Sequence, residues 1–469
     1  MNNSVSEGNK VIKSGVWFTV SNFIMKSIGF ITTPIFTRLL TKAEFGDFNN
    51  FQTWMMILLY ITSLNLEGSL IRAVKEFRDD IDTYLLSMIS LSMGSTIVWA
   101  IVCNVAYPIV GDMLSVNRVY LNCMFMYLFF APTVNLFQNI ERFKYKYKWT
   151  VATSMTVSIG ASLLSVVLVI SMPDKLFGRV IGYIAPTVII GAVIFVYYLK
   201  KVKAINIQYW KYALPITLPY IPHLLSMYLL GNMDRVMIKR FCGSEDLALY
   251  SLAYTCGMII TMLLSSINSA YSPWLSDKLS EEDYNATRKI SVIYIGVFSF
   301  VSIGIVLITP EILLILGGES YLEAKHVMPP VAAGCLLQFV YTIYVNVEQY
   351  EKKTIGMAVA SAAAAFVNYV LNYIFIPAYG YIAAAYTTYI GYFVLLIIHM
   401  GYVKKIGKWN VYNNTLVFAI AVSASVLMFL NHFLLEVNIV RYILIVIYML
   451  IVVAFVLRNK QQIRTLVKK

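Results

Sequence analysis

Apolar stretches of about 20 residues recur from one end of the chain to the other, and this pattern limits the fold more than any other feature. A helix of about 20 apolar residues crosses the roughly 30 Å hydrocarbon core of a bilayer, whereas a barrel strand alternates polar and apolar residues over about 10 positions. The chain is 59% hydrophobic and 13% charged, against about 25% charged residues in a soluble domain. The sequence therefore predicts an all-α, polytopic membrane protein.

About 14 transmembrane helices are expected from the apolar stretches and the charged loops between them. The first twelve group into six before and six after the basic linker that follows residue 199. The expected helices cover residues 14–37, 48–70, 84–107, 119–140, 149–172, 177–199, 214–238, 247–275, a ninth ending near 316, 327–350, 354–376, 381–403, 412–435 and 439–457.

Basic residues are unevenly distributed between the two sides that this helix order defines. Of the 37 Lys and Arg residues, about 26 fall on the side that holds both termini and about 10 on the other. Positive residues concentrate in cytoplasmic loops, so both termini are predicted to be cytoplasmic. The same bias accounts for the net charge of +13 without a nucleic-acid partner.

A shift of 202 residues brings corresponding features of the two halves into register, which indicates an internal repeat. The matches are Arg38 with Arg240, 44–48 with 246–250, and 178–183 with 380–385. An even number of helices per repeat gives parallel repeats with the substrate site between them. The predicted domains are two pseudo-symmetric six-helix bundles, 1–203 and 204–405, followed by an extra helix pair and basic tail, 406–469.

Several chemistries lack the residues they need. The five cysteines have no paired spacing, and the sequence contains no metal-ligand cluster and no phosphate-binding glycine loop. We therefore expect no enzyme, no metal site, no cofactor and no nucleotide-driven pump.

Charged residues within apolar segments are the candidate functional residues, because charge at membrane depth usually faces a protein interior or a wet path. Lys26 lies about midway along the first segment and is expected to line a cavity, although it could snorkel to the surface or pair structurally. Arg235 and Lys239 are four residues apart and share a helix face. Asp234 could pair with a basic residue or bind a coupling ion.

Three further residues complete the candidate set. Arg38 lies near the end of the first helix and could be an interface anchor or another cavity cation. Glu67, toward the end of the second helix, and Glu348, near the inner end of the tenth, are candidate gating or coupling groups.

Three stretches resemble signatures of bacterial polysaccharide flippases of the Wzx type, in the multidrug/oligosaccharidyl-lipid/polysaccharide exporter superfamily. They are residues 31–46, residues 233–238 followed by 248–254, and residues 368–380. The resemblance extends over nearly the whole chain. One departure is Ala383, where the family pattern favours glycine, but close helix packing tolerates either small residue.

The resemblance implies a membrane transporter, not an enzyme, that flips an undecaprenyl-diphosphate-linked oligosaccharide repeat unit from the cytoplasmic to the outer leaflet by alternating access. Its location would be the bacterial cytoplasmic membrane, and its role surface polysaccharide (O-antigen or capsule) biosynthesis. Implied partners are the lipid-linked glycan, membrane lipids and the glycan polymerase of the pathway, with coupling to H⁺ or Na⁺. In this setting Lys26 suits a diphosphate counter-ion.

Three alternatives stay open on the sequence. A cation-coupled multidrug exporter of the same fold should carry carboxylates in the N-terminal half, where Lys26 is the one mid-helix charge expected. A lipid II flippase would share the fold and the lipid carrier. A non-transporting scaffold would gain little from charges buried at membrane depth.

Overall fold

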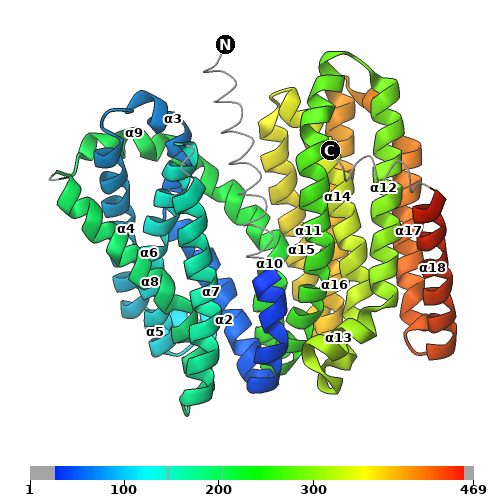
Figure 1. Cartoon of the computed structure of the whole chain (residues 1–469), viewed down its shortest axis with the longest axis horizontal. Helices are drawn as coiled ribbons and strands as arrows, with labels where there is room; N and C mark the ends of the chain where they lie inside the picture. The colour runs from blue at the N-terminus through cyan, green and yellow to red at the C-terminus, as the bar shows by residue number, and fades with distance from the viewer. Residues whose placement is uncertain (1–26, 145–146, 203, 459–469) are drawn as a thin grey trace. The chain divides into compact units, whose positions relative to one another are not determined.

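The computed structural model describes residues 27–144, 147–202 and 204–458, and these residues form helices and no strands. Residues 27–39 are helical and precede α2 (Figure 1). The other elements are α2 (Lys42–Thr62), η1 (Leu66–Ser69), α3 (Leu70–Glu76), α4 (Ile81–Val105), α5 (Tyr107–Leu114), α6 (Arg118–Phe143), α7 (Tyr147–Ser171), α8 (Lys175–Lys201), α9 (Ile207–Thr217), η2 (Leu218–Tyr220), α10 (Ile221–Phe241), α11 (Ser244–Ser280), α12 (Tyr284–Leu307), α13 (Thr309–Gly317), η3 (Glu319–Val327), α14 (Met328–Tyr350), α15 (Thr354–Tyr379), α16 (Tyr381–Lys405), η4 (Trp409–Val411), α17 (Asn414–Leu434) and α18 (Asn438–Arg458).

Eleven helices of the described chain are long and apolar enough to cross a membrane, or twelve if a bent pair is one span. The all-α, multi-pass prediction is thus confirmed. The number 14 stays a prediction, because the first expected helix begins outside the described residues and the apolar part of α18, Asn438–Ala454, is shorter than the other spans.

Three predicted helices are interrupted, and the ninth is divided into α12 and α13 at Ile308. The second expected helix bends by 47° between α2 and Leu66–Glu76. Leu64 and Asn65 there have φ angles of 52° and 48°, in the left-handed region that ends a helix. The seventh becomes α9, η2 and α10 around Pro215, Pro219 and Pro222, because each proline lacks the backbone N–H that a continuous helix needs.

The chain forms two compact units, Met1–Ala248 (unit 1) and Leu249–Lys469 (unit 2). The boundary lies within the second turn of α11. This division places α9 and α10 in unit 1, and the predicted six-plus-six helix division with a separate helix pair stays a prediction.

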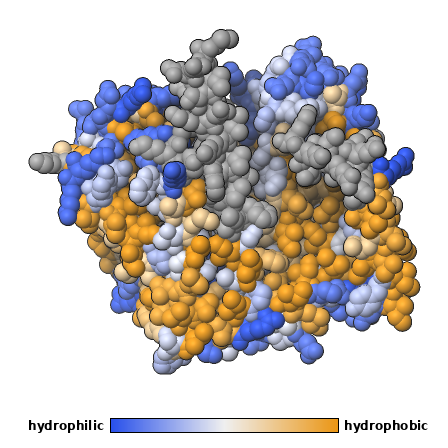
Figure 2. Space-filling view, viewed as in Figure 1, coloured by the Kyte–Doolittle hydropathy of each residue, from blue (hydrophilic) through white to orange (hydrophobic). Residues whose placement is uncertain are grey.

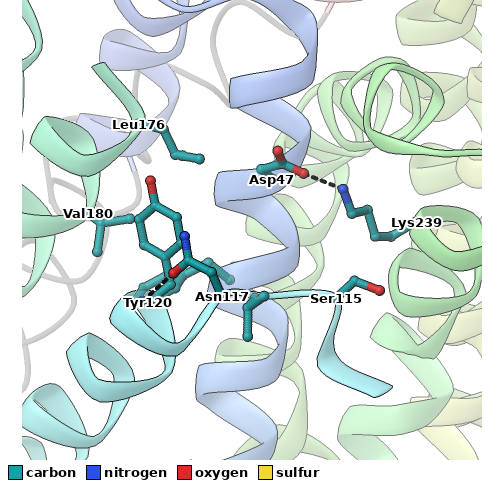
Figure 3. A pocket seen from close by; sticks show the side chains of 9 residues that line it. Asp47, Ser115, Asn117, Tyr120, Leu176, Val180 and Lys239 are labelled. Carbon is teal, nitrogen blue, oxygen red and sulfur yellow. Dashed lines mark hydrogen bonds and ion pairs between the residues drawn. The ribbon is translucent and has the colours of Figure 1, made fainter. Parts of the chain in front are cut away.

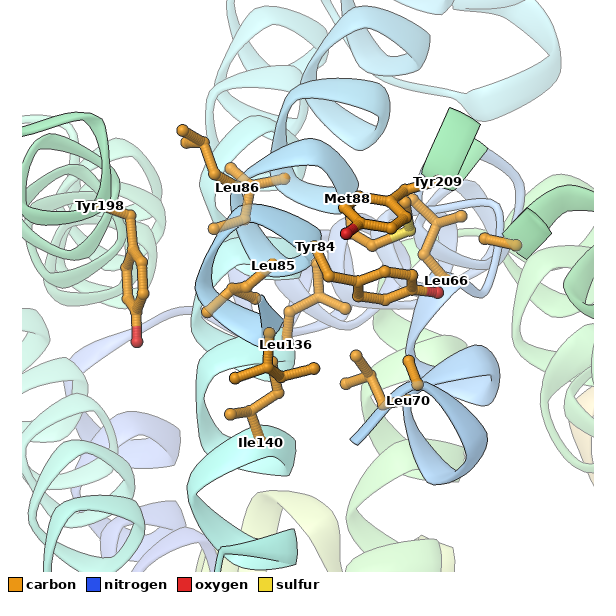
Figure 4. Close-up of a cluster of buried hydrophobic side chains, with 14 of the residues drawn as sticks. Leu66, Leu70, Tyr84, Leu85, Leu86, Met88, Leu136, Ile140, Tyr198 and Tyr209 are labelled. Atoms are coloured by element: carbon orange, nitrogen blue, oxygen red, sulfur yellow. The ribbon is translucent and has the colours of Figure 1, made fainter. Parts of the chain in front are cut away.

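One core of unit 1 brings together η1, α3, α4, α6, α8 and α9 around aromatic side chains (Figure 4). Tyr84 is fully buried and its hydroxyl donates to Ser69 Oγ at 2.7 Å. Its ring centroid lies 5.1 Å from that of Tyr209, whose hydroxyl donates to Asp80 Oδ2 at 2.5 Å. Tyrosine suits this place because its ring packs as an apolar group while its hydroxyl finds a partner.

Elsewhere in unit 1, the backbone of α2 packs directly against the backbone of the turn between α10 and α11. A Cβ built at Gly46 would lie 1.9 Å from the Ser244 carbonyl oxygen, so only glycine fits there. Gly243, with φ of 98°, makes the tight turn after α10. The close approach brings the side chains around Asp47 to those at the end of α10.

In unit 2, α14 is the most buried of the described spans and packs against α12, α15, α16 and α17. The last helix, α18, instead exposes apolar side chains. Figure 2 shows exposed hydrophobic residues, in orange, over much of the surface that faces the viewer. Arg441, 2% exposed, holds α18 to its neighbours. Its Nη1 donates to the Leu307 carbonyl at 3.0 Å, and the guanidinium contacts both Glu311 carboxylate oxygens at 2.6 and 2.7 Å.

Candidate functional site

In unit 1, the side chain of Arg179 lies between aromatic rings. Arg179 is in the second turn of α8, and its guanidinium carbon lies 3.6 Å from the ring centroid of Phe36 and 4.2 Å from that of Phe48. Tyr183, one turn along α8, packs edge-on against Phe48 at 5.6 Å. Both phenylalanines are almost fully buried. Stacking on aromatic faces stabilises a guanidinium in an apolar setting.

No carboxylate pairs with Arg179 among the residues that the structure describes. Its Nε–H is buried without a hydrogen-bond partner, whereas the two terminal nitrogens are not enclosed. A buried charge normally has a counter-charge, and a guanidinium binds carboxylate or phosphate through paired N–H groups. The arrangement leaves the donors at the tip of Arg179 available to an anion.

A second polar site in unit 1 is a pocket of about 190 Å³ near the ends of α2, α6, α8 and α10. Asp47 and Lys239 form an ion pair on one side of it, and Figure 3 shows Asn117 and Tyr120 on the other. Ser244 donates to Asp47 Oδ1 at 2.7 Å and also hydrogen-bonds to Lys239. The pair therefore joins α2 to the end of α10 and the start of α11.

The predicted cationic face of α10 is divided between two environments. Lys239 is engaged by Asp47, as described above, while the guanidinium of Arg235 donates to Asn232 in the previous turn. Asp234 is 1% exposed and accepts a hydrogen bond from the Arg235 backbone N–H at 2.8 Å. The structure brings Lys239 to an acidic partner in α2 that the sequence did not single out.

The remaining predicted residues of unit 1 lie apart. Arg38 is exposed and donates to the Pro34 carbonyl of its own helix at 2.8 Å. Glu67 follows the bend after α2 and accepts a hydrogen bond from Asn139 at 2.8 Å. Lys26 lies outside the described residues, so its role stays a prediction.

In unit 2, Glu348 of α14 contacts His399 of α16. His399 Nδ1 lies 2.7 Å from Glu348 Oε1, and the two side chains are 2% and 0% exposed, respectively. The other carboxylate oxygen, Oε2, is buried without a hydrogen-bond partner. The sequence singled out Glu348 but not His399, which lies 51 residues later.

A neutral polar network joins α15 to α16 in the same unit. Asn368 donates to Thr388 at 3.2 Å and accepts from Asn372 at 3.1 Å, while Thr387 donates to Asn372. All four side chains are buried. Neutral side chains that hydrogen-bond to each other can join helices within a membrane without burying a net charge.

Two of the main features were not found from the sequence. Neither Arg179 nor His399 was singled out, and the aromatic neighbours Phe36 and Phe48 of Arg179 come from the helix 27–39 and from α2. A usable signal was that Arg179 lies within an apolar stretch, not before it. No group of three metal-ligating residues with suitable geometry occurs in the described part of the chain.

Two family models and several curated proteins match the chain. The model of a family described as polysaccharide biosynthesis protein matches residues 11–279, and a model named MatE matches residues 219–374. Lsg locus putative protein 1 of Haemophilus influenzae is 23% identical, over 72% of this chain and 84% of its own length. A membrane protein of Methanocaldococcus jannaschii is 20% identical over 89% of both chains.

Solved structures with a similar fold are transporters. A lipid II flippase, MurJ, in an inward closed conformation has a TM-score of 0.70 and 13% identity, and the match covers 96% of this chain and 100% of that one. An inward-facing multidrug resistance transporter of the MATE family has a TM-score of 0.62 and 12% identity, over 84% and 95%. At these identities the likeness shows the fold. The family match over residues 11–279, more than half of the chain, together with the MatE match, identifies the chain as a member of the polysaccharide biosynthesis protein family, a Wzx-type flippase of the multidrug/oligosaccharidyl-lipid/polysaccharide exporter superfamily.

Proposed function

We propose that this protein flips an undecaprenyl-diphosphate-linked oligosaccharide repeat unit from the cytoplasmic to the outer leaflet of the bacterial cytoplasmic membrane. Transport would proceed by alternating access and serve surface polysaccharide biosynthesis. The family supports a lipid-linked glycan as the substrate class. The glycan polymerase of the same pathway is the proposed partner, and both termini are proposed to be cytoplasmic.

The observation that carries this proposal is the environment of Arg179. A diphosphate brings negative charge into the membrane, and the protein has to offset the loss of its hydration. Arg179 has its planar face held by Phe36 and Phe48 and its terminal nitrogens open. Such a guanidinium is prepared to hydrogen-bond a phosphate without first breaking an ion pair.

Other charged residues are proposed to assist it. Lys26, Arg38 and Arg235 are proposed as further cations along the path, and Asp234 and Glu67 as coupling or gating groups. Lys239 would join them only in a state in which its pair with Asp47 opens. No cofactor is proposed, and coupling would use H⁺ or Na⁺.

Two related functions compete with this one. In a multidrug exporter, the positive charge of Arg179 would repel cationic drugs. Arg179 therefore argues against that function. A lipid II flippase would use the same diphosphate carrier, and Arg179 suits it equally well. The two flippases differ in the attached glycan, so the substrate itself has to be identified.

The deciding experiment is to deplete the protein in its host and extract the lipid-linked intermediates. We expect a single oligosaccharide repeat on the undecaprenyl carrier to accumulate in the cytoplasmic leaflet while surface polysaccharide is lost, with its mass naming the glycan. Accumulation of lipid II instead would identify the second flippase function. Normal surface glycan with raised sensitivity to cationic dyes would refute the proposal and favour the exporter.

A further inference from the structure

We propose that Glu348 and His399 form a proton-binding site in unit 2, and that loading and unloading of this site drives transport. Proton binding by the pair is independent of the function proposed above, whereas its link to transport rests on that function. The two residues come from α14 and α16, which pack against each other.

The contact between the two side chains requires a shared proton. At 2.7 Å, Nδ1 and Oε1 are at hydrogen-bond distance, so a hydrogen lies between them. With a neutral imidazole donating to a carboxylate, the pair has a net charge of −1. One further proton makes it neutral overall, as imidazolium with carboxylate or as imidazole with carboxylic acid. The pair therefore has two states that differ by one proton.

Burial makes these two states unequal in free energy. Both side chains are almost fully inaccessible, and a net charge in such a place is costly unless it is compensated. Glu348 Oε2 adds to the cost of the charged state because it is buried without a donor. The two states should therefore exchange when a conformational change admits water to the pair.

An aromatic ring lies parallel to the imidazole. The Tyr341 ring centroid is 5.6 Å from that of His399, with an interplanar angle of 13°, and Tyr392 stacks on Tyr341 at 6.2 Å. The stacked rings cover one face of the imidazole with largely apolar surface, which helps to keep water from the enclosed pair.

The neighbouring elements supply few other charges. Glu348 is the sole acidic residue of α14, α15, α16 and α17, and α15 has no basic residue or histidine. Glu351, beyond the end of α14, is paired with Lys408 at 2.9 Å. Besides the pair, these elements, α12 and η3 carry the following titratable or charged side chains: Cys335, Tyr341, Tyr344 and Tyr350 of α14; Tyr381, Tyr386, Tyr389, Tyr392, Tyr402, Lys404 and Lys405 of α16; Tyr284, Arg288, Lys289 and Tyr294 of α12; Tyr369, Tyr373 and Tyr379 of α15; His432 of α17; and Glu319, Tyr321, Glu323, Lys325 and His326 of η3.

The position of the pair suits exchange with water. Glu348 is two residues from the end of α14, and its backbone carbonyl accepts from the Lys353 N–H at 2.9 Å beyond that end. A change of one helical turn there would expose the carboxylate. A pair in the middle of the span would need a longer water path. We therefore assign the protonation change to opening at this end of α14 and α16.

Infrared difference spectroscopy of the purified, full-length protein tests proton binding directly. Spectra at several pH values in H₂O and D₂O should contain a band of the protonated carboxyl or of the imidazolium that shifts in D₂O and changes with pH. We expect the band to disappear in Glu348→Gln and to change frequency or midpoint in His399→Asn, which keeps a donor near the Nδ1 position. Glu323→Gln, at an exposed glutamate of η3, should leave the band unchanged.

Transport is tested in inverted membrane vesicles carrying the host's own radiolabelled lipid-linked glycan. Periodate does not cross the bilayer, so the glycan that resists oxidation has been flipped into the lumen. For one proton per substrate, an acid lumen one pH unit below the outside should raise the flipped fraction relative to the unflipped up to about tenfold. Glu348→Gln and His399→Asn should flip equally with and without the gradient.

The outcomes separate the inference from the proposed function. If the wild-type protein shows neither a carboxyl nor an imidazolium band that changes with pH and is removed by Glu348→Gln, proton binding by the pair is refuted, even if wild-type vesicles flip glycan normally. A titrating band with an unchanged gradient response in both variants would refute the coupling. Failure of wild-type vesicles to protect any glycan, with the band present, would count against the flippase and the coupling while supporting the proton site.

Discussion

Two arginines, one in each unit, lie among apolar side chains, and their guanidinium groups have different kinds of partner. Arg441 of unit 2 contacts both oxygens of Glu311 and a backbone carbonyl. Arg179 of unit 1 has aromatic rings on its faces and no carboxylate partner among the described residues. The first arginine completes a helix contact, whereas the second is left to bind something else. Residue type and burial alone would not distinguish them.

The same contrast extends to the acidic residues. In unit 2, the buried carboxylate of Glu348 faces a histidine, a partner that can itself gain or lose a proton. In unit 1, the ion pair of Lys239 with Asp47 lies at helix ends and is partly exposed. Among the described residues, unit 1 thus contains a cation, Arg179, without a carboxylate partner, and unit 2 an acid, Glu348, whose partner is a histidine. This division fits an anionic substrate in the first unit and a coupling proton in the second.

Replacing Arg179 should have the largest effect on transport. Hydrogen bonds to charged groups contribute about 1.5–3 kcal/mol, so Arg179→Gln should reduce glycan flipping about 10- to 100-fold in the periodate assay. Arg179→Lys should fall in between, because it keeps the charge but loses the planar stack. Protein level and unfolding temperature should stay near those of the wild type. Normal flipping by Arg179→Gln would show that the residue is structural and end the contrast with Arg441.

Replacing Arg441 should instead lower stability. Arg441→Gln leaves Glu311 without its bidentate partner and the end of α18 without its main polar anchor. We expect a loss of roughly 2 kcal/mol, less than for a fully buried pair because the Glu311 side chain is 38% exposed. The apparent unfolding temperature in detergent measures it. If Arg441→Gln lowers flipping strongly while the unfolding temperature is unchanged, then Arg441 also acts in transport.

Much of the fold could be predicted because helix positions depend on local patterns. The apolar stretches near 84–107, 119–140 and 381–403 correspond to α4, α6 and α16 within a few residues. The breaks were harder to predict. The prolines near the start of α10 indicate a break there. The left-handed turn at Leu64–Asn65 contains no glycine or proline, so the sequence does not indicate it.

The site could be predicted only in part, because its pairs join residues far apart in the chain. Glu348 stood out as a charge in an apolar stretch, but its partner is 51 residues away and its identity depends on how α14 packs on α16. Glu311 and Arg441 are 130 residues apart. Arg179 could not be identified from the sequence because its distinguishing feature is the lack of a carboxylate partner among the described residues. That feature becomes visible only when the neighbouring helices are known.

A smaller effect is expected for Lys239, the unit 1 cation that does have a carboxylate. Its side chain is 17% exposed and that of Asp47 is 36% exposed, so their coupling free energy should be about 0.5–1 kcal/mol. A double-mutant cycle with Lys239→Ala and Asp47→Ala measures this coupling in the unfolding temperature. Flipping should fall by no more than about two- to fivefold. A large loss for Lys239→Ala but not for Asp47→Ala would make Lys239 a substrate cation like Arg179.

The smallest expected effect is an acid dependence confined to unit 2. Glu311 lies between the spans. Burial acts to raise the pKa of its carboxyl, but the hydrogen bonds and charge of Arg441 outweigh burial and lower that pKa below 4.5. A lowered pKa in the folded state contributes stability that is present above the unfolded value and is lost as pH falls through the folded value. The unfolding temperature should therefore not change through this pair between about pH 7 and 5, and should decline below about pH 4.

The variants decide whether this acid dependence belongs to the Glu311–Arg441 pair. In Glu311→Gln the decline below about pH 4 should be shallower than in the wild type, because the neutral amide has no proton to gain. Arg441→Gln should show the same reduced slope, since the pKa of Glu311 then loses the influence that lowers it. Arg179→Gln should keep the wild-type slope, because no carboxylate of the described chain pairs with Arg179. An equal change of slope in Arg179→Gln would mean that Arg179 also has a carboxylate partner, and the sites of Arg179 and Arg441 would no longer differ in kind.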